Sequence, residues 1–253
     1  MELSGLERQR TPAGNTATGW LKIIALIFMV IDHIGVIFFP DTYELRVLGR
    51  IAFPLYAWCL VVGFYYTHSV PKYMLRLAFV GVISQPLYVL AIGHPWAKPN
   101  IFLTLLMGLA VLWAIREKWH FSQFWAPTAA ILLATLLDIS YGWKGIAFIV
   151  LLYEASGSMT GLAAVMVAFF LYWGTGYPVT TSLFGIPIHM DMLPEFLRYP
   201  LSAFLRLQTY GLLSLPFILI PFRKDLRLPS WLGYAVYPAH LLVLLLVKAA
   251  VLR

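Results

Sequence analysis

Residues 20–39 have the sequence WLKIIALIFMVIDHIGVIFF, an apolar run that contains Lys22 and the adjacent pair Asp32 and His33. About 20 apolar residues are enough for a helix to cross the hydrocarbon core of a bilayer. A charged aspartate near the centre of such a helix costs about 2.5–3.5 kcal/mol on insertion scales. Chains keep such groups in a membrane where they do chemistry or conduct something. The pair is therefore the first candidate for a functional site.

The composition extends this picture to the rest of the chain. Of the 253 residues, 61% are hydrophobic and 11% are charged, whereas about 25% are charged in ordinary soluble domains. Apolar runs of membrane-spanning length recur from residue 20 to the C-terminus. We therefore expect an all-α fold, a polytopic transmembrane helical bundle that forms one domain over residues 20–253. Residues 1–19 are polar, and we expect a flexible tail there.

The apolar runs divide into about nine expected spans, within a range of eight to ten. They cover roughly residues 20–39, 46–66, 73–92, 100–116, 124–138, 143–155, 158–173, 201–221 and 231–251. The longest connection, about 174–200, carries Gly, Pro and acidic residues together with apolar ones. We expect this connection to contain an interfacial helix or a re-entrant segment.

The formal net charge of +7 is spread over many short loops. This pattern suits anionic lipid headgroups and topology signals, and it argues against a nucleic-acid surface. Arg116 with Lys118, and the cationic cluster from Arg223 to Arg227, favour a cytoplasmic N-terminus. The single cysteine excludes a disulfide framework. The spacing of the histidines, acids and cysteine predicts no closed metal site.

Helix geometry separates the three polar residues of the first run. Lys22 and His33 are eleven residues apart, so at about 100° per residue they project from the same face. Asp32 points about 100° away from His33 and needs a partner on another helix. We interpret His33 as a candidate general base, with a structurally buried histidine as the alternative. Lys22 is either a ligand contact or an interfacial lysine that reaches the headgroups.

The second apolar run supplies a partner for Asp32. Arg46 and Arg50 lie one helical turn apart, and Arg50 is followed by apolar residues and Pro54. We expect Arg50 to pair with Asp32, either as a structural lock between two helices or as part of a catalytic site. For Arg46, nearer the end of the run, we favour a lipid headgroup contact.

Other polar residues in apolar surroundings are further candidates. His240 follows Pro238 inside the last run, and it either serves the site or bonds a carbonyl that the proline frees. Asn100 suits a helix N-cap or a ligand contact. Tyr141 either faces the site or belongs to a turn.

Cationic side chains are the candidates for holding a phosphorylated donor, because the sequence has no Gly-rich phosphate loop and no serine elbow. Lys72 and Arg76 share a helix face at the start of the third run, and Arg116 and Lys118 are alternatives.

Several short segments together form a recognisable pattern. They are Leu21–Ala25, Met29–His33, Gly49–Ala57, Asn100–Phe102, Ser140–Gly142 and the terminal Tyr237 to His240. In these segments the chain resembles the TraX family of pilin N-acetyltransferases. The resemblance implies acetyl-CoA as donor substrate, the N-terminal amine of a conjugative pilin as acceptor, and the bacterial inner membrane as location.

The spacing of Lys22 and His33 is also similar to the basic-x10-His signature of the wider membrane acyltransferase superfamily. That superfamily O-acetylates surface polysaccharides and includes the lysosomal heparan glucosaminide acetyltransferases. The similarity implies that acetyl-CoA enters from the cytoplasm and that the acceptor lies on the far side of the membrane. A polysaccharide hydroxyl is therefore an alternative acceptor.

We thus expect an integral membrane acetyltransferase in a lipid bilayer. His33 would take the proton of the acceptor, directly or through an acetyl-histidine relay. Asp32 would orient His33 through the fold or pair with Arg50, and Lys22 or Arg50 would stabilise the thioester oxyanion or contact CoA. The expected acetyl-CoA contacts are Lys22, Lys72, Arg76, Asn100 and Tyr141.

Two alternatives come from other functional classes. A proton-coupled transporter would use Asp32, His33 and His240 as a proton relay, although the sequence lacks the internal repeat typical of many transporters. A non-catalytic assembly factor would bind pilin in the bilayer and would tolerate replacement of Asp32 and His33.

Overall fold

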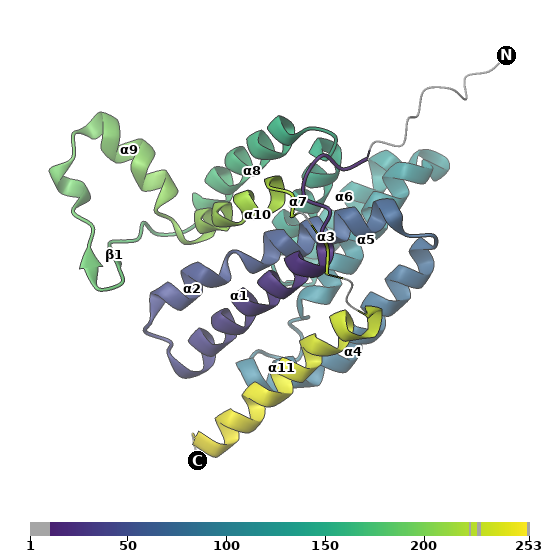
Figure 1. The fold of residues 1–253 in the computed structure, drawn as a ribbon, viewed down its shortest axis with the longest axis horizontal. Coiled ribbons are helices and arrows are strands. Elements are labelled where there is room, and N and C mark those ends of the chain that lie inside the picture. Colours follow the sequence, from purple (N-terminus) through teal and green to yellow (C-terminus); the bar gives the residue numbers. More distant parts are fainter. Residues whose placement is uncertain (1–10, 223, 227–228, 252–253) are drawn as a thin grey trace.

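Helices make up most of the computed structural model, which describes residues 11–222, 224–226 and 229–251 (Figure 1). The α-helices are α1 Thr18–Phe38, α2 Tyr43–Gly49, α3 Ala52–Tyr66, α4 Val70–Ile92, α5 Ile101–Glu117, α6 Ser122–Leu136, α7 Gly142–Ala155, α8 Met159–Gly174, α9 Glu195–Phe204, α10 Leu215–Leu219 and α11 Ser230–Val251. Short 3-10 helices are η1 Trp119–Phe121, η2 Met190–Met192 and η3 Leu207–Ser214, and strands β1 Ser182–Leu183 and β2 Ile186–Pro187 form one hairpin. The expected all-α bundle is confirmed.

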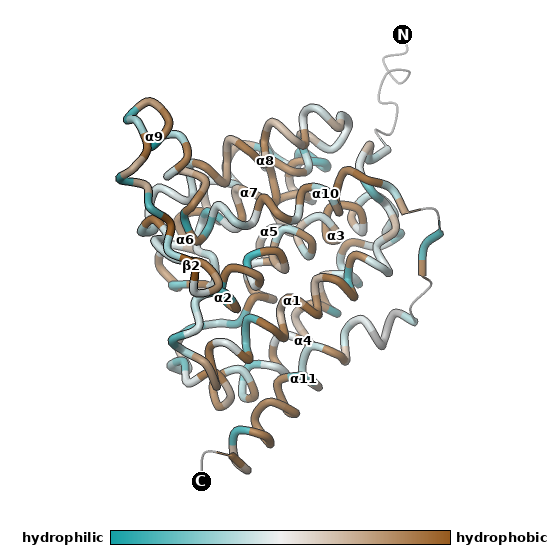
Figure 2. Tube along the Cα trace, turned by 60° about the vertical axis from the view of Figure 1, so that its left-hand side comes forward, coloured by the Kyte–Doolittle hydropathy of each residue, from teal (hydrophilic) through white to brown (hydrophobic). Residues whose placement is uncertain are grey.

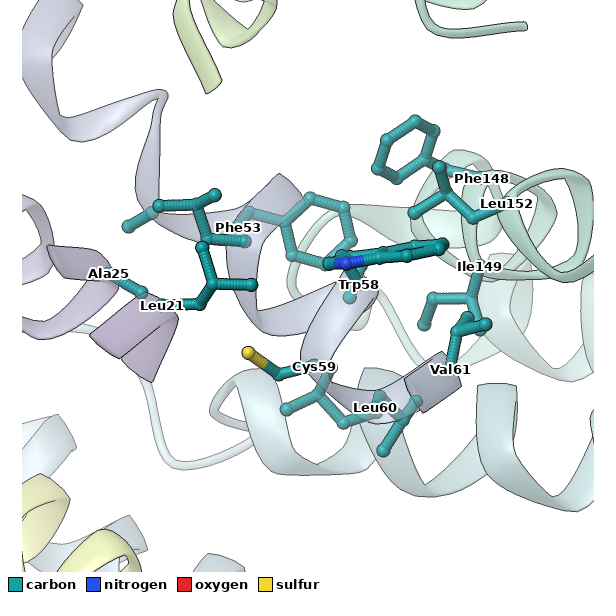
Figure 3. Packing of buried hydrophobic residues seen from close by; sticks show 14 of the residues in the cluster. Leu21, Ala25, Phe53, Trp58, Cys59, Leu60, Val61, Phe148, Ile149 and Leu152 are labelled. Carbon is teal, nitrogen blue, oxygen red and sulfur yellow. The ribbon is translucent and has the colours of Figure 1, made fainter. Parts of the chain in front are cut away.

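Helix α3 forms the centre of the bundle. All but four of its fifteen residues are buried, as expected for a helix that is apolar on every face. Figure 3 shows Trp58 of α3 between Leu21 of α1 and Leu152 of α7. Because α1 and α7 cover opposite sides of α3, the segments that carry the polar residues of α1 are fixed against a rigid core.

Within the described residues, four helical segments are long and apolar enough to cross a membrane: Thr18–Phe38, Tyr43–Tyr66, Val70–Ile92 and Gly233–Val251. Large apolar side chains on α4 and α11, such as Phe79 and Leu246, are exposed, and apolar residues follow each other along α11 (Figure 2). The protein is therefore a membrane protein. Helices α5 to α8 occupy four of the expected spans but are only 14–17 residues long, so the expected count of about nine is not confirmed.

The expected span over 46–66 lies within the helical segment Tyr43–Tyr66, and the helix is distorted between α2 and α3. Pro54 has no N–H with which to bond the carbonyl of Arg50. The amides of Arg50 and Ile51 instead donate to Val47 and Leu48, three residues back, at 3.1 and 3.2 Å. This tightened turn sets the direction of the Arg50 side chain.

The expected continuous helix over 201–221 is wrong. The chain there forms the end of α9, then η3 and α10. Pro216 at the start of α10 cannot donate the amide bond that would continue a regular helix. Gly211 of η3 lies so close to α8 that a Cβ atom would come within 2.3 Å of Phe170.

Between α8 and η3 the chain leaves the bundle and carries the hairpin and α9, at the left of Figure 1. Its stem is fixed to α2, where the Thr180 hydroxyl donates to the Tyr43 oxygen at 3.1 Å and the Phe184 amide donates to Glu44 Oε1 at 2.6 Å. None of the residues of α9 is buried. The helix expected in this connection is present, and its place in the membrane interface stays a prediction.

Part of the expected flexible tail is packed inside the bundle. Asn15 is 1% exposed, its amide N–H donates to Ile218 O at 2.6 Å, and its carbonyl accepts from Trp58 Nε1 at 2.7 Å. The Ala13 amide donates to Ser156 O at 2.7 Å. Residues 1–10 of the tail, and Arg223 and Arg227 of the topology argument, lie outside the described residues.

Candidate functional site

Two cavities lie at opposite ends of α1. The Lys22 cavity, of about 550 Å³, is lined by the first halves of α1, α4 and α11 and includes Lys22, Arg76 and Asp225. The His33 cavity, of about 460 Å³, is lined by the second half of α1, by α2 and α3, and by the loops around residues 94–98 and 138–142. Asp32 and His33 both line this second cavity.

Asp32 is held by two arginines. Its Oδ1 accepts a hydrogen bond from Arg50 Nη2 and its Oδ2 pairs with Arg46 Nη1, both at 2.8 Å. Arg50 is buried, and its Nε donates to the Arg46 carbonyl at 3.2 Å. The expected pair of Asp32 with Arg50 is present, and Arg46 also pairs with Asp32 while its side chain stays partly exposed. The headgroup contact favoured for Arg46 stays a prediction. Two guanidinium groups against one carboxylate leave a positive charge beside the cavity.

Gly49 makes this close contact between α1 and α2 possible. A Cβ atom at this position would lie 2.1 Å from Asp32 Oδ1 and 2.5 Å from Asp32 Cγ. Real Cβ atoms do not approach so closely, so only glycine allows the carboxylate to reach both arginines.

His33 is hydrogen bonded to His240. The distance from His33 Nδ1 to His240 Nε2 is 3.0 Å, and His240 Nδ1 lies 3.2 Å from Val236 O. A carbonyl can only accept, so His240 Nδ1 carries a proton. With both rings neutral, His240 Nε2 then accepts from His33 Nδ1–H. This assignment leaves His33 Nε2 with a free lone pair. His33 lines the cavity, and His240 stands behind it.

Tyr141 lines the His33 cavity from the turn that precedes α7. Its ring stacks on Phe53 with centroids 4.1 Å apart. Thr104 donates to the Ser140 carbonyl, and the Ser140 hydroxyl donates to Pro99 O at 2.8 Å. Burial raises the pKa of Tyr141 to about 12, so its hydroxyl stays protonated at neutral pH.

The sequence did not indicate three polar residues that line the His33 cavity: His94, Lys98 and Asp138. Each belongs to a loop, where a polar residue has no unusual environment by sequence alone. Partial burial, with the nearby charges of Lys98 and Arg46, lowers the pKa of His94. The one sequence feature that could have indicated them is position: His94 and Lys98 lie just before Asn100, and Asp138 lies just before Ser140–Gly142.

The Lys22 cavity brings together Lys22 and Arg76, which the sequence singled out separately. The Arg76 guanidinium lies 5.9 Å from the ring centroids of both Tyr73 and Tyr234. Although Lys22 and His33 share a helix face as expected, the structure puts them in different cavities, about 16 Å apart along α1 by helix rise.

Several expected donor contacts line neither cavity. Asn100 is 2% exposed; its Oδ1 accepts from the Phe102 amide at 3.0 Å, and its Nδ2 donates to a carbonyl of α4 at 2.7 Å. Its role as an N-cap is therefore confirmed. Lys72 is exposed beside the Lys22 cavity without lining it, and Arg116 and Lys118 lie at the far end of α5.

Comparison with known proteins adds an independent finding. The family model described as TraX protein matches residues 17–248. The chain is 46% identical over 72 residues to a probable fimbrial assembly protein, FimC of serogroup H1, from Dichelobacter nodosus, which covers 27% of this chain and 30% of that protein. It is 34% identical over 140 residues to protein TraX of Escherichia coli, with 53% of this chain and 54% of that protein covered.

The chain is also 30% identical over 149 residues to the uncharacterized protein RP591 of Rickettsia prowazekii, with 56% of this chain and 57% of that protein covered. The matched regions thus span about a third to somewhat over half of the length of these curated relatives. No solved structure matches.

Proposed function

Because the chain belongs to the TraX protein family, we propose that it is an integral membrane acetyltransferase of the bacterial inner membrane. It moves the acetyl group of acetyl-CoA to an acceptor amine, the N-terminus of a pilin subunit. The family and the similarity to a probable fimbrial assembly protein support a pilin-related role. The acetyl-transfer step rests on the hydrogen bonds around His33.

The observation that carries the proposal is the hydrogen-bond chain from Val236 through His240 to His33. It leaves His33 Nε2 free as a general base at a cavity wall. An α-amine has a pKa of roughly 7.7–8, so an imidazole is a suitable acceptor of its proton. His240 is a positioning residue, because it fixes the tautomer and the orientation of His33.

The Lys22 cavity is assigned to acetyl-CoA. Lys22 and Arg76 supply two positive charges for the CoA phosphates, and the apolar lining of the cavity suits the pantetheine arm. With a cytoplasmic N-terminus, this cavity faces the cytoplasm, where acetyl-CoA is made. The acceptor then enters the His33 cavity from the other side of the membrane.

In the reaction, the amine nitrogen attacks the thioester carbonyl carbon and a C–N bond forms. His33 Nε2 takes the proton that the nitrogen loses. The C–S bond then breaks, and the CoA thiolate leaves and receives that proton. The positive charge beside Asp32, contributed by Arg46 and Arg50, stabilises the negative charge on the carbonyl oxygen during the attack.

One observation favours a second function. Two cavities that reach a shared wall from opposite ends of α1 would also suit a central site that opens to each side of the membrane in turn. A proton-coupled transporter that uses Asp32, His33 and His240 is therefore the alternative. It predicts substrate flux across vesicles without consumption of acetyl-CoA. A surface-polysaccharide acceptor would use the same base and differs from the proposal only in the acetylated product.

The test is transfer of labelled acetyl from acetyl-CoA to a pilin N-terminal peptide by the purified protein in liposomes, with mass spectrometry of the product. We expect transfer by the wild type and its loss in His33→Ala. The matched control is His68→Ala, because His68 is exposed and lines neither cavity. Unchanged transfer by His33→Ala would end the assignment of His33 as the base.

A further inference from the structure

The two cavities share a wall. Three residues line both of them: Tyr56 from α3, Ile101 from α5 and Tyr237 from α11. Lys22 lines one cavity only, and His33 lines the other only. These three side chains therefore stand between the cationic end of one cavity and the histidine pair of the other.

Under the proposed function, this wall is where the reacting atoms meet. The attacking nitrogen must lie within hydrogen-bond reach of His33 Nε2, and the thioester carbon must lie about 3–3.5 Å from that nitrogen. The thioester arrives from the Lys22 cavity, so its carbonyl group reaches His33 at the wall. Lys22 is about three helical turns away and cannot contact this carbonyl.

Two of the three wall residues carry a hydroxyl that has no hydrogen-bond partner in the part of the chain that the structure describes. Among the described residues, neither Tyr56 nor Tyr237 forms a hydrogen bond through its phenol oxygen. The phenol oxygens of Tyr56 and Tyr237 are also not among the fully buried polar atoms that lack a hydrogen bond. Both hydroxyls therefore border cavity space and are available as donors.

The ring of Tyr237 is held firmly beside the histidine pair. It packs edge-to-face against Phe102 at 4.8 Å and against His240 at 5.1 Å between centroids. The His33 ring lies 5.2 Å from the same His240 ring. Tyr237 and His33 thus flank one imidazole, which places the Tyr237 ring close to the base.

Tyr56 reaches the wall from the most buried helix of the bundle. Its neighbours in the chain, Leu55 and Ala57, are fully buried, so the helix that presents this ring has little freedom to move. Arg50 uses Nη2 for Asp32 and Nε for the Arg46 carbonyl, and it does not line the wall. It therefore acts on the carbonyl oxygen through its charge alone, and the hydrogen-bond donors must come from other residues.

We propose that Tyr56 and Tyr237 are catalytic residues whose hydroxyls donate hydrogen bonds to the thioester carbonyl oxygen. The inference rests on the proposed function. As the C–N bond forms, this oxygen gains negative charge, and the two phenols stabilise it while keeping their protons. As the C–S bond breaks, an electron pair on the oxygen re-forms the C=O double bond. The negative charge then leaves on the sulfur of the CoA thiolate. Preorganised donors of this kind are among the largest contributions to acyl transfer.

The test compares Tyr56→Phe and Tyr237→Phe with the wild type in the same liposome assay. Phenylalanine keeps the ring and its packing and removes only the hydroxyl. Loss of one such donor lowers kcat by about 10²–10³-fold in known cases, and we expect a fall of about 10²-fold here with little change in KM for acetyl-CoA. The matched control is Tyr66→Phe, on the same helix as Tyr56, because Tyr66 is exposed and lines neither cavity.

Wild-type kcat in both Tyr56→Phe and Tyr237→Phe, with active wild-type protein, would overturn the inference and leave the proposed function standing. Absence of acetyl transfer by the wild type would instead remove the proposed function, and the inference with it. Thermal unfolding in detergent, unchanged in the active-site variants, separates loss of the hydroxyl from loss of the fold.

Discussion

Asp32 shows how a single carboxylate is made acceptable inside a membrane helix. Its two oxygens are divided between Arg46 and Arg50, and the absence of a side chain at Gly49 lets the three groups meet. A buried ion pair is weak evidence for net stability, but removing or displacing one partner leaves an uncompensated charge.

The first prediction concerns Gly49→Ala. The added methyl group cannot fit beside Asp32 Oδ1, so it must push α2 away and break both ion pairs. We expect a loss of about 3–5 kcal/mol, typical of leaving a buried charge unpaired, measured as lower thermal stability in detergent. Gly176→Ala is the control, since a Cβ atom at that position would have its nearest neighbour 4.0 Å away. Equal stability of the two variants would contradict this account.

The second prediction concerns His240→Ala. His33 would keep its place in the cavity but lose the partner that fixes its tautomer. We expect kcat to fall at least about tenfold, since general-base catalysis contributes about 10²–10⁴-fold in all, while KM for acetyl-CoA stays nearly constant. Steady-state kinetics with varied acetyl-CoA check this. A change confined to KM would instead indicate that His240 supports donor binding.

At the scale of single residues, the sequence predicted the contact that local geometry determines. Asp32 and His33 project about 100° apart on their helix, and Arg46 and Arg50 lie one helical turn apart. These two facts were enough to pair Asp32 with Arg50. The bond from His33 to His240 joins residues 207 positions apart. This bond depends on how α11 packs against α1, and hydrophobic periodicity does not predict the packing of helices that are distant in the chain.

At the scale of elements, the long apolar runs were sufficient for α1, α4 and α11, whose bounds lie within a few residues of the expected spans. Hydropathy could not reveal the distorted turn at Arg50 or the division of 201–221, because both arise from prolines and close contacts with other helices. For the connection between α8 and η3, which contains α9, the sequence predicts only an interfacial helix or a re-entrant segment.

The third prediction places α9 in the membrane interface. Phe196 and Tyr199 are 75% and 65% exposed, and a helix with aromatic residues on a broad apolar face is typical of interfacial helices. In a Cys59→Ser background, a fluorescent label at Phe196→Cys should be quenched by doxyl-labelled lipids. The same label at Arg198→Cys, on the polar face, is the control and should be quenched much less. Equal quenching at both positions would exclude this orientation.

At the scale of the whole molecule, the bundle separates two chemical environments along α1. The Lys22 cavity offers cations, and the His33 cavity offers a free imidazole nitrogen beside a charged cluster. A layout of this kind lets a donor and an acceptor approach from opposite sides and meet at one wall. Neither cavity could be predicted from the sequence, because each is lined by helices that are distant in the chain.

The fourth prediction uses the single cysteine as a reporter of this layout. Cys59 lines the Lys22 cavity only, so a membrane-impermeant maleimide should reach it from the N-terminal face of α1. We expect slow labelling in inverted vesicles and little in right-side-out vesicles, and we expect CoA to slow it further. Cys59→Ser is the background control. Labelling from the opposite face, or labelling unaffected by CoA, would contradict the donor assignment.

The buried segment around Asn15 bears on the order in which the molecule is completed. Its hydrogen-bond partners are Trp58, Ser156, Phe217 and Ile218. Ile218 is made by the ribosome about two hundred residues after Asn15, so the Asn15 segment cannot complete its hydrogen bonds until those residues have been synthesised. The segment around Asn15 therefore packs into the bundle late, and its position must stay unfilled during the early stages of membrane insertion.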